Sequence, residues 1–290
     1  MKGRLEIKRV GIIGTGVMGR GIAQITAESG YETLIYDAKP EAVIDALNTI
    51  RKMLERAVEK GAKTSGEAEA TFKRIKPCRS IEEVARGEVD LVIEAVYEDV
   101  ETKRQVFQEL DRHCKKECIL ASNTSSISIT LIASYTKRPE NVIGLHFFNP
   151  APVMKLVEVV LGEWTSRETL ETALKFVESL GKVPVQVKDT PGFIVNRLII
   201  PLINEAAQMV MEGVAKPEDI DTACKLGLNH PIGPLALADL IGLDVIQAIM
   251  ETLYRETGDP KYRVSPLIRR MVRAGLLGRK TGRGFYTYAK

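Results

Sequence analysis

The stretch that decides the fold is Ile7-Lys8-Arg9-Val10-Gly11-Ile12-Ile13, followed directly by Gly14-Thr15-Gly16-Val17-Met18-Gly19. The first seven residues form an apolar, β-branched run that is typical of a buried strand. Residues 17–30 then show a helical pattern, which Gly30 can end. A glycine-rich turn therefore joins a predicted strand to a predicted helix.

A G-x-G-x-x-G turn in this context is typical of dinucleotide binding, because each glycine has a separate task. Gly14 permits the tight turn, Gly16 lets a pyrophosphate approach the backbone, and Gly19 lets the helix pack against the strand. Val17 and Met18 follow Gly16, and the amides at this helix N-terminus are expected to face the phosphates.

An acidic residue ends the second predicted strand, residues 33–37. Asp37 lies 18 positions after Gly19, where a carboxylate accepts hydrogen bonds from the adenosine ribose hydroxyls. The same charge would repel a 2′-phosphate, so NAD is expected as the cofactor in preference to NADP. Lys39 lies close enough to keep NADP open.

Strand-like runs alternate with amphipathic segments through the first part of the chain. This alternation predicts βαβ units, and so a Rossmann-type, mainly parallel sheet covered on both faces. The charged, helical segment 40–72 does not belong to the minimal unit, and we interpret it as a projecting helical hairpin. The strands are expected at residues 7–13, 33–37, 90–96, 118–123, 142–148, 155–160 and 183–189.

Helical periodicity replaces the strand signal after residue 189. A boundary at Asp189-Thr190-Pro191-Gly192 divides the chain into a Rossmann domain, residues 1–188, and an all-α domain, residues 189–290. The helical stretches are 193–213, 216–227, 233–258 and 265–278. The first is apolar around most of its circumference, as expected for a helix in a core or an interface.

Composition excludes several classes of function. The 290 residues carry a net charge of +3 with basic and acidic residues interspersed, so no nucleic-acid partner is expected. No segment approaches the ~20 apolar residues that span a bilayer, so no membrane partner is expected. The four cysteines form no disulfide framework and indicate a cytoplasmic protein. His113, Cys114 and Cys118 match no zinc spacing, and no metal is expected.

Two ionisable residues, His146 and Glu158, interrupt the apolar stretch 144–160. Asn149-Pro150-Ala151-Pro152 cannot continue a central strand, so a hairpin is predicted. Symmetry about Pro152 places His146 opposite Glu158, with Cβ atoms about 5 Å apart. The carboxylate would fix one imidazole nitrogen and leave the other as a general base. Beside a dinucleotide, this pair predicts oxidation of an alcohol; the alternative is a buried pair that does no chemistry.

Either direction of that reaction needs a hydrogen-bond donor near the reacting oxygen. Polar residues follow the strand at 118–123, at the end where ligands of open α/β sheets collect. Each polar residue on its own could instead serve a turn or a helix cap. The candidates are Ser122, Asn123, Ser125, Asn149 and Asn196.

Several long stretches resemble the short-chain L-3-hydroxyacyl-CoA dehydrogenases of the 3-hydroxybutyryl-CoA dehydrogenase type, in the same order and over essentially the whole chain. The stretches are GIIGTGVMGRGIA (11–23), EAVYED (94–99), ASNTSSISIT (121–130), GLHFFNPAPVMKLVEVV (144–160), KDTPGFIVNRLIIPLINEA (188–206) and GRKTGRGFYTY (278–288). The aromatic pair after the histidine, Phe147 and Phe148, favours the acyl-CoA branch over related dehydrogenases of free hydroxy acids or sugar acids.

The resemblance implies a role for each matching residue. His146 would be the general base and Glu158 its partner, while Ser125 and Asn196 would contact substrate near the reacting oxygen. Asn149 would be a neighbouring polar residue of the site. The remaining cofactor contacts that we expect are Asp37 at the ribose, Glu98 and Lys103 along the nicotinamide half, and Asn123.

The resemblance also implies that the hairpin 40–72 helps to hold coenzyme A, with Lys60 as the expected phosphate contact, and that the all-α domain forms a homodimer. The expected reaction is NAD-dependent interconversion of (S)-3-hydroxyacyl-CoA and 3-oxoacyl-CoA, in particular 3-hydroxybutyryl-CoA and acetoacetyl-CoA, in fatty acid metabolism. Two alternatives stay open: a dehydrogenase of a free hydroxy acid or sugar acid, and a dinucleotide-binding protein without catalysis.

Overall fold

The computed structural model describes residues 6–288, and the chain divides into two compact units, Met1–Thr190 and Pro191–Lys290. In the described part of the first unit, the sheet has eight strands in the order β3-β2-β1-β4-β5-β6-β7-β8. Neighbouring strands run parallel except β6 and β7, which are antiparallel. Their bounds are β1 Arg9–Ile13, β2 Glu32–Tyr36, β3 Ile75–Pro77, β4 Leu91–Glu94, β5 Ile119–Ser122, β6 Val142–Phe147, β7 Leu156–Leu161 and β8 Val183–Lys188.

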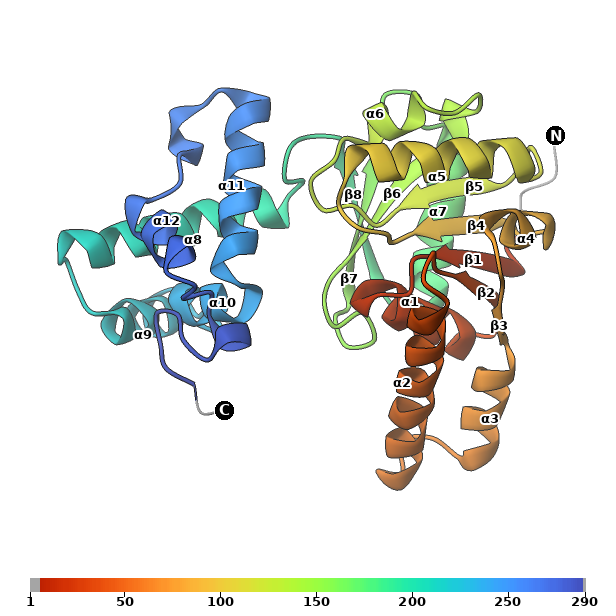
Figure 1. The fold of residues 1–290 in the computed structure, drawn as a ribbon, viewed down its shortest axis with the longest axis horizontal. Helices are drawn as coiled ribbons and strands as arrows, with labels where there is room; N and C mark the ends of the chain where they lie inside the picture. The colour runs from red at the N-terminus through yellow and green to blue at the C-terminus, as the bar shows by residue number, and fades with distance from the viewer. Residues whose placement is uncertain (1–5, 289–290) are drawn as a thin grey trace. The chain divides into compact units, whose positions relative to one another are not determined.

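Helices cover both faces of this sheet (Figure 1). On one face, α1, α2 and α7 contribute residues such as Ile22, Ile50 and Phe176 to a cluster with the central strands. On the other face lie α4, α5 and α6, with α5 in front of the strands in Figure 1. The bounds are α1 Val17–Glu28, α2 Pro40–Glu59, α3 Ser65–Lys73, α4 Ile81–Arg86, α5 Val100–His113, α6 Ile129–Ala133 and α7 Arg167–Ser179.

The helices α2 and α3 form a hairpin that projects beyond the sheet (Figure 1). Of the 20 residues of α2, only Val43, Ala46, Ile50 and Leu54 are buried, along one side of the helix. Thr64 and Glu67 close the start of α3 with a reciprocal capping box. A largely polar surface is what a projecting hairpin requires, since little of it can pack on a core.

The second unit is helical, as predicted. Its bounds are α8 Val195–Glu212, α9 Pro217–Gly227, α10 Pro234–Ile241, α11 Leu243–Thr257 and α12 Pro266–Arg273. The helical pattern at 233–258 is broken at Gly242, whose φ of +104° ends α10. Buried Asp239 accepts hydrogen bonds from the backbone N–H groups of Phe285 and Tyr286, which fixes this segment to α10.

The predicted fold class is therefore confirmed: a Rossmann-type sheet with a projecting hairpin, followed by helices. Sequence reasoning missed β3, a strand of three residues that contains Pro77. Proline is tolerated there because β3 lies at the edge of the sheet. Within residues 6–288, no helix combines the length and apolarity needed to cross a membrane.

Candidate functional site

Except for Lys60 of the hairpin, the predicted site residues of the first unit lie at or next to one edge of the sheet. Because β1, β2, β4, β5 and β6 are parallel, their carboxyl ends all meet at that edge. The loops that follow these strands begin at Gly14, Asp37, Ala95, Asn123 and Phe148. The antiparallel strand β7 starts from the same edge, so Glu158 is brought there as well. Ligands of open α/β sheets bind at this edge.

Two glycines of the turn after β1 are required by the chain itself. Gly14 has a φ of +93°, and a Cβ there would lie 2.6 Å from the carbonyl oxygen of Ala95. A Cβ at Gly19 would lie 1.8 Å from the carbonyl oxygen of Gly14. Neither position can hold a larger residue while α1 stays packed at the end of β1. This is the packing that the sequence motif predicts.

Gly16 differs, because nothing in the chain requires it. Its φ is −59°, which any residue adopts, and apart from its neighbours in the chain no described atom lies within 4 Å of where its Cβ would be. No side chain among the described residues caps the start of α1, and its first turn contains no acidic residue. Open space and uncapped N–H groups at a helix N-terminus fit the pyrophosphate of a dinucleotide.

The carboxylate of Asp37 is held beside this turn. Its Oδ2 accepts hydrogen bonds from the Thr15 N–H at 2.7 Å and the Thr15 hydroxyl at 3.2 Å, and its Oδ1 accepts one from the Lys39 N–H at 3.0 Å. Thr15 is buried, whereas Lys39 is exposed. The acid that ends β2 is therefore fixed next to the glycine turn, where a ribose of a bound dinucleotide would lie.

His146 and Glu158 face each other across β6 and β7, in the register that hairpin symmetry predicts. Nδ1 of His146 lies 2.6 Å from Oε2 of Glu158. Both residues are buried, with 7% and 0% of their surface exposed. The ring of Phe148 lies 4.5 Å from the imidazole, measured between centroids, and tilts by 50°. The pair is thus desolvated and fixed, and Nδ1 is the nitrogen that meets the carboxylate.

The face of the sheet that carries this pair follows from strand alternation. Leu145 and Phe147, the neighbours of His146, point into the cluster that contains α1 and α7. His146 therefore points to the opposite face, the one on which Ile129 of α6 packs closely against Gly144. A Cβ at Gly144 would come within 2.9 Å of Ile129, so α6 needs this glycine to approach the sheet.

A buried charge network underlies the loop after β4. Glu94 ends β4 with no exposed surface, and Lys103 of α5 is 1% exposed. The Lys103 ammonium donates to Glu94 Oε1 at 2.7 Å and lies 3.3 Å from Glu98 Oε2. Ser122 donates to Glu94 Oε2 at 2.7 Å. Because the Lys103 ammonium is buried between two carboxylates, it offers almost no surface to a ligand. It would affect a ligand only indirectly, by fixing the position of Glu98.

Glu98 in turn organises the loop after β5. Its Oε1 accepts hydrogen bonds from the Thr124 hydroxyl at 2.6 Å and from the N–H groups of Ser125 and Ser126 at 2.9 and 3.0 Å. Burial alone would raise the pKa of the Glu98 carboxyl, but the Lys103 charge and these hydrogen bonds outweigh it and lower that pKa. An ionised Glu98 thus fixes the position of Ser125.

Other predicted residues are distributed as follows. The Ser122 hydroxyl donates its hydrogen bond to Glu94. The side-chain oxygen of Asn123 accepts a hydrogen bond from the Phe147 N–H at 2.9 Å. Both side chains thus hold neighbouring strand ends together. Asn149 and Lys60 are exposed, in the β6–β7 connection and at the end of α2. Asn196 belongs to α8 of the second unit.

Sequence reasoning missed Glu94 and Lys182 as residues that shape the site. An acid at the end of the apolar run Leu91–Glu94 was a signal for the first, because a buried strand rarely ends in a carboxylate without a partner. The ammonium of Lys182 lies within 2.7 Å of the Ala151 carbonyl oxygen, a contact that no sequence pattern indicated. Among residues 6–288, no group of three or more His, Cys, Asp or Glu is arranged to hold a metal ion.

Comparison with known proteins covers both units. The family model described as "3-hydroxyacyl-CoA dehydrogenase, NAD binding domain" matches residues 9–190, and that for the C-terminal domain matches residues 192–288. A probable 3-hydroxybutyryl-CoA dehydrogenase of Bacillus subtilis is 51% identical over 284 residues, which cover 98% of each protein. The 3-hydroxybutyryl-CoA dehydrogenase of Clostridioides difficile is 49% identical over 282 residues, 97% of this chain and 100% of that relative.

The fold is likewise shared with a solved structure. The crystal structure of (S)-3-hydroxybutyryl-CoA dehydrogenase PaaH1 from Ralstonia eutropha superposes with a TM-score of 0.95 at 47% identity, covering 98% of this chain and 100% of that one. Sequence and structure agree over both units, and the glycine turn and the polar edge of the sheet fit a dinucleotide. The chain therefore belongs to the 3-hydroxyacyl-CoA dehydrogenase family of oxidoreductases, which depend on a nicotinamide dinucleotide.

Proposed function

We propose that this protein interconverts (S)-3-hydroxybutyryl-CoA and acetoacetyl-CoA with NAD as the cofactor. The observation that carries the proposal is the buried pair of His146 and Glu158, 2.6 Å apart at the edge of the sheet where the glycine turn lies. The names of the relatives at 51% and 49% identity support the four-carbon substrate.

The imidazole of His146 is the group that moves the proton in this proposal. An ionised Glu158 only accepts hydrogen bonds, so Nδ1 carries a hydrogen and Nε2 keeps a lone pair. Nε2 takes the proton of the substrate hydroxyl during oxidation and returns it to the oxygen during reduction. Glu158 stabilises the positive charge that His146 then carries. The bound nicotinamide cofactor supplies the hydride acceptor or donor.

The remaining polar residues would serve the reacting oxygen and the cofactor. Ser125, which Glu98 fixes by the N–H bond at 2.9 Å, is assigned as a donor to that oxygen, and Asn196 joins it by the family motif. Asn149 is assigned to the substrate. The cofactor residues that we propose are Gly14, Gly16, Gly19, Val17, Met18, Asp37, Glu98 and Asn123, with Lys103 acting through Glu98.

NAD is proposed over NADP because of Asp37. Its carboxylate is fixed by Thr15 at 2.7 Å and cannot swing away from the glycine turn without losing that bond. A 2′-phosphate placed beside it would meet a negative charge, whereas a ribose 2′-hydroxyl would donate a hydrogen bond to it. Exposed Lys39 is the feature that would partly offset the repulsion.

Coenzyme A is proposed to lie along the hairpin of α2 and α3. Lys52, Arg56 and Lys60 are exposed and follow each other at intervals of four residues, so they share one side of α2. A row of positive charge suits the phosphates of coenzyme A. Lys52 and Arg56 are therefore proposed, together with Lys60, as contacts of the coenzyme A phosphates.

A homodimer through the second unit is proposed as well. Large apolar side chains on or next to its helices are exposed, among them Leu198 at 69%, Leu226 at 81% and Leu228, just after α9, at 58%. Exposed apolar surface of this kind is costly in a monomer and is typical of an interface. A cytoplasmic location remains a prediction from the cysteines, which are free thiols in the structure.

The test of the proposed function is an NADH-consumption assay with acetoacetyl-CoA, compared with free acetoacetate and with 3-oxo sugar acids at the same concentration. We expect turnover of the thioester with NADH, and at most weak turnover of the free acids. Turnover of a free acid but not of the thioester would favour the hydroxy-acid alternative. NADH binding without turnover of any of these substrates would favour a non-catalytic dinucleotide-binding protein.

A further inference from the structure

The connection between β6 and β7 is anchored by a buried lysine that lies outside it in the sequence. Lys182 comes just before β8 and is only 8% exposed. Its ammonium donates hydrogen bonds to the carbonyl oxygens of Ala151 at 2.7 Å, Met154 at 2.8 Å and Pro152 at 3.2 Å. An ammonium has three hydrogens to donate, and three carbonyls of a single loop accept them.

Burial of this ammonium is unfavourable unless those bonds are made. Desolvation lowers the pKa of Lys182 below its usual value, and the charge of Glu28 offsets this only in part. The loop carbonyls thus provide the compensation that a buried cation needs. Removal of the ammonium would leave the carbonyls of Ala151, Pro152 and Met154 without this partner, so the loop and the lysine stabilise each other.

The same loop also rests on the dinucleotide helix α1. A Cβ at Gly21 of α1 would lie 3.2 Å from the Ala151 Cβ and 3.2 Å from the Pro152 Cδ. Ala151 is 3% exposed and belongs to the main core cluster of the first unit. The loop therefore contacts both α1, whose N-terminus borders the glycine turn, and the ammonium of Lys182.

This loop joins the strand of His146 to the strand of Glu158. It starts with Phe148, whose ring lies 4.5 Å from the imidazole, and it ends at Lys155, whose carbonyl oxygen accepts the Val183 N–H at 2.7 Å. A displacement of the loop would therefore change how the imidazole sits relative to α1. A shift of about 1 Å at a reacting group can lower a rate by about 10²-fold.

We propose that Lys182 is a positioning residue of the reaction: its ammonium fixes the β6–β7 connection against α1 and so sets the place of His146 relative to the cofactor. The inference rests on the proposed function, because a position for His146 matters only if the imidazole moves the proton. Lys182 itself touches neither reacting group, and its effect should appear in kcat rather than in cofactor binding.

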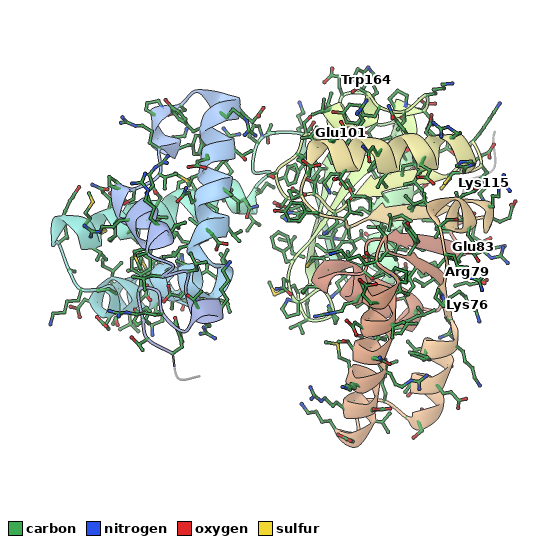
Figure 2. All side chains as sticks on the ribbon, in the orientation of Figure 1. Lys76, Arg79, Glu83, Glu101, Lys115 and Trp164 are labelled. Atoms are coloured by element: carbon green, nitrogen blue, oxygen red, sulfur yellow. The ribbon has the colours of Figure 1, made fainter. Side chains whose placement is uncertain are left out.

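The experiment compares Lys182→Met, which keeps most of the length of the side chain without the charge, with Lys182→Arg, which keeps the charge and several donors. Lys115→Met is the matched control, because the Lys115 ammonium also makes a structural contact, to Asp90 Oδ1 at 2.5 Å. Lys115 precedes β5 and so lies at the amino end of the strands, away from the proposed site (Figure 2). Cofactor affinity is read as energy transfer to NADH from Trp164, the only tryptophan, which lies exposed after β7 (Figure 2).

We expect Lys182→Met to lower kcat with acetoacetyl-CoA by at least about tenfold, while the dissociation constant of NADH changes less than about threefold. Lys182→Arg should recover part of the lost kcat. Lys115→Met should stay within about twofold of the wild-type kcat. Unchanged kcat in Lys182→Met would overturn the proposal. So would equal losses of kcat in Lys182→Met and Lys115→Met, because both would then report only general stability.

A second variant decides the matter if Lys182→Met does not fold. Gly21→Ala removes no hydrogen bond and suits a helix, but it presses on Ala151 and Pro152 from the α1 side. We expect it to fold and to lower kcat more than it weakens NADH binding, whereas an unchanged kcat would contradict the role of the loop. If the wild-type protein is inactive on acetoacetyl-CoA, the proposed function is contradicted, and the positioning role that rests on it is contradicted too.

Discussion

His146 and Glu158 occupy paired positions of the antiparallel strands β6 and β7, and Nδ1 of the imidazole lies 2.6 Å from Oε2 of the carboxylate. Neither side chain has appreciable contact with solvent. A carboxylate in this position selects the tautomer of the imidazole and favours the protonated ring after proton transfer. Sheet register therefore sets which face of the sheet the proposed base is on and which of its nitrogens meets the carboxylate.

Replacement of Glu158 by glutamine tests that orientation. The amide of the glutamine could accept a hydrogen bond but would carry no charge to stabilise the imidazolium, so kcat should fall roughly 10²- to 10⁴-fold, as when the acid that orients a catalytic histidine is lost. NADH affinity should change little, because the carboxylate faces the imidazole. Steady-state kinetics with acetoacetyl-CoA measure the effect, and wild-type kcat in Glu158→Gln would show that the pair is structural.

Glu98→Gln tests the network behind Ser125. Because folding lowers the pKa of the Glu98 carboxyl below its usual 4.5, ionised Glu98 stabilises the fold at pH values above 4.5, and this contribution is lost as pH falls through the lower, folded value. We expect Glu98→Gln to unfold at a lower urea concentration than wild type at about pH 7, with the difference shrinking as the pH falls below 4.5. The variant should also lose activity, since Ser125 is no longer fixed.

The control for this variant is Glu101→Gln. Glu101 lies in the first turn of α5 (Figure 2). It forms an exposed ion pair with Arg104. Loss of an exposed pair changes stability little, so its urea midpoint and activity should stay near those of wild type. A stability difference between Glu98→Gln and wild type that grows as the pH falls would contradict the assigned direction of the Glu98 shift.

Sequence patterns predicted the parts of this molecule that depend on local spacing. The glycine turn, Asp37 and the opposition of His146 to Glu158 follow from motif, strand length and hairpin symmetry. The contacts of Lys182 with Ala151 and of Glu98 with Ser125 join residues 31 and 27 positions apart. Such contacts depend on how loops from different strands meet, which neither periodicity nor a local motif specifies.

Gly16→Ala separates binding from folding. Alanine adopts the φ of −59° found at this position and would meet no atom of the described chain, so the variant should be as stable as wild type or slightly more so. Its methyl group would occupy the space proposed for the pyrophosphate, and NADH should bind at least about tenfold more weakly. Unaltered NADH affinity in a folded Gly16→Ala protein would mean that the phosphates lie elsewhere.

Gly19→Ala provides the contrast, since its methyl group would lie 1.8 Å from the Gly14 carbonyl oxygen. This variant should lose stability as well as NADH affinity, by overpacking at the end of β1. Thermal unfolding of both variants without cofactor distinguishes the two glycines. Equal stability of Gly16→Ala and Gly19→Ala would contradict the division of tasks within the turn.

Asp37→Ser tests the choice between NAD and NADP. Serine removes the negative charge at the ribose end but keeps a hydroxyl near Thr15. The ratio of kcat/KM for NADH to kcat/KM for NADPH should fall by at least about tenfold, mostly through weaker discrimination against the 2′-phosphate. Steady-state kinetics with both cofactors measure this ratio. If Asp37→Ser prefers NADH over NADPH as strongly as wild type does, another residue sets the cofactor specificity.

The central claim is that the imidazole of His146 carries the proton of the reaction, and His146→Gln tests it most directly. The measurement is kcat for NADH oxidation by acetoacetyl-CoA, taken together with the dissociation constant of NADH from Trp164 energy transfer. The account predicts a fall in kcat of about 10²- to 10⁴-fold with NADH affinity close to that of wild type. A His146→Gln protein that turns over acetoacetyl-CoA at the wild-type rate would contradict it.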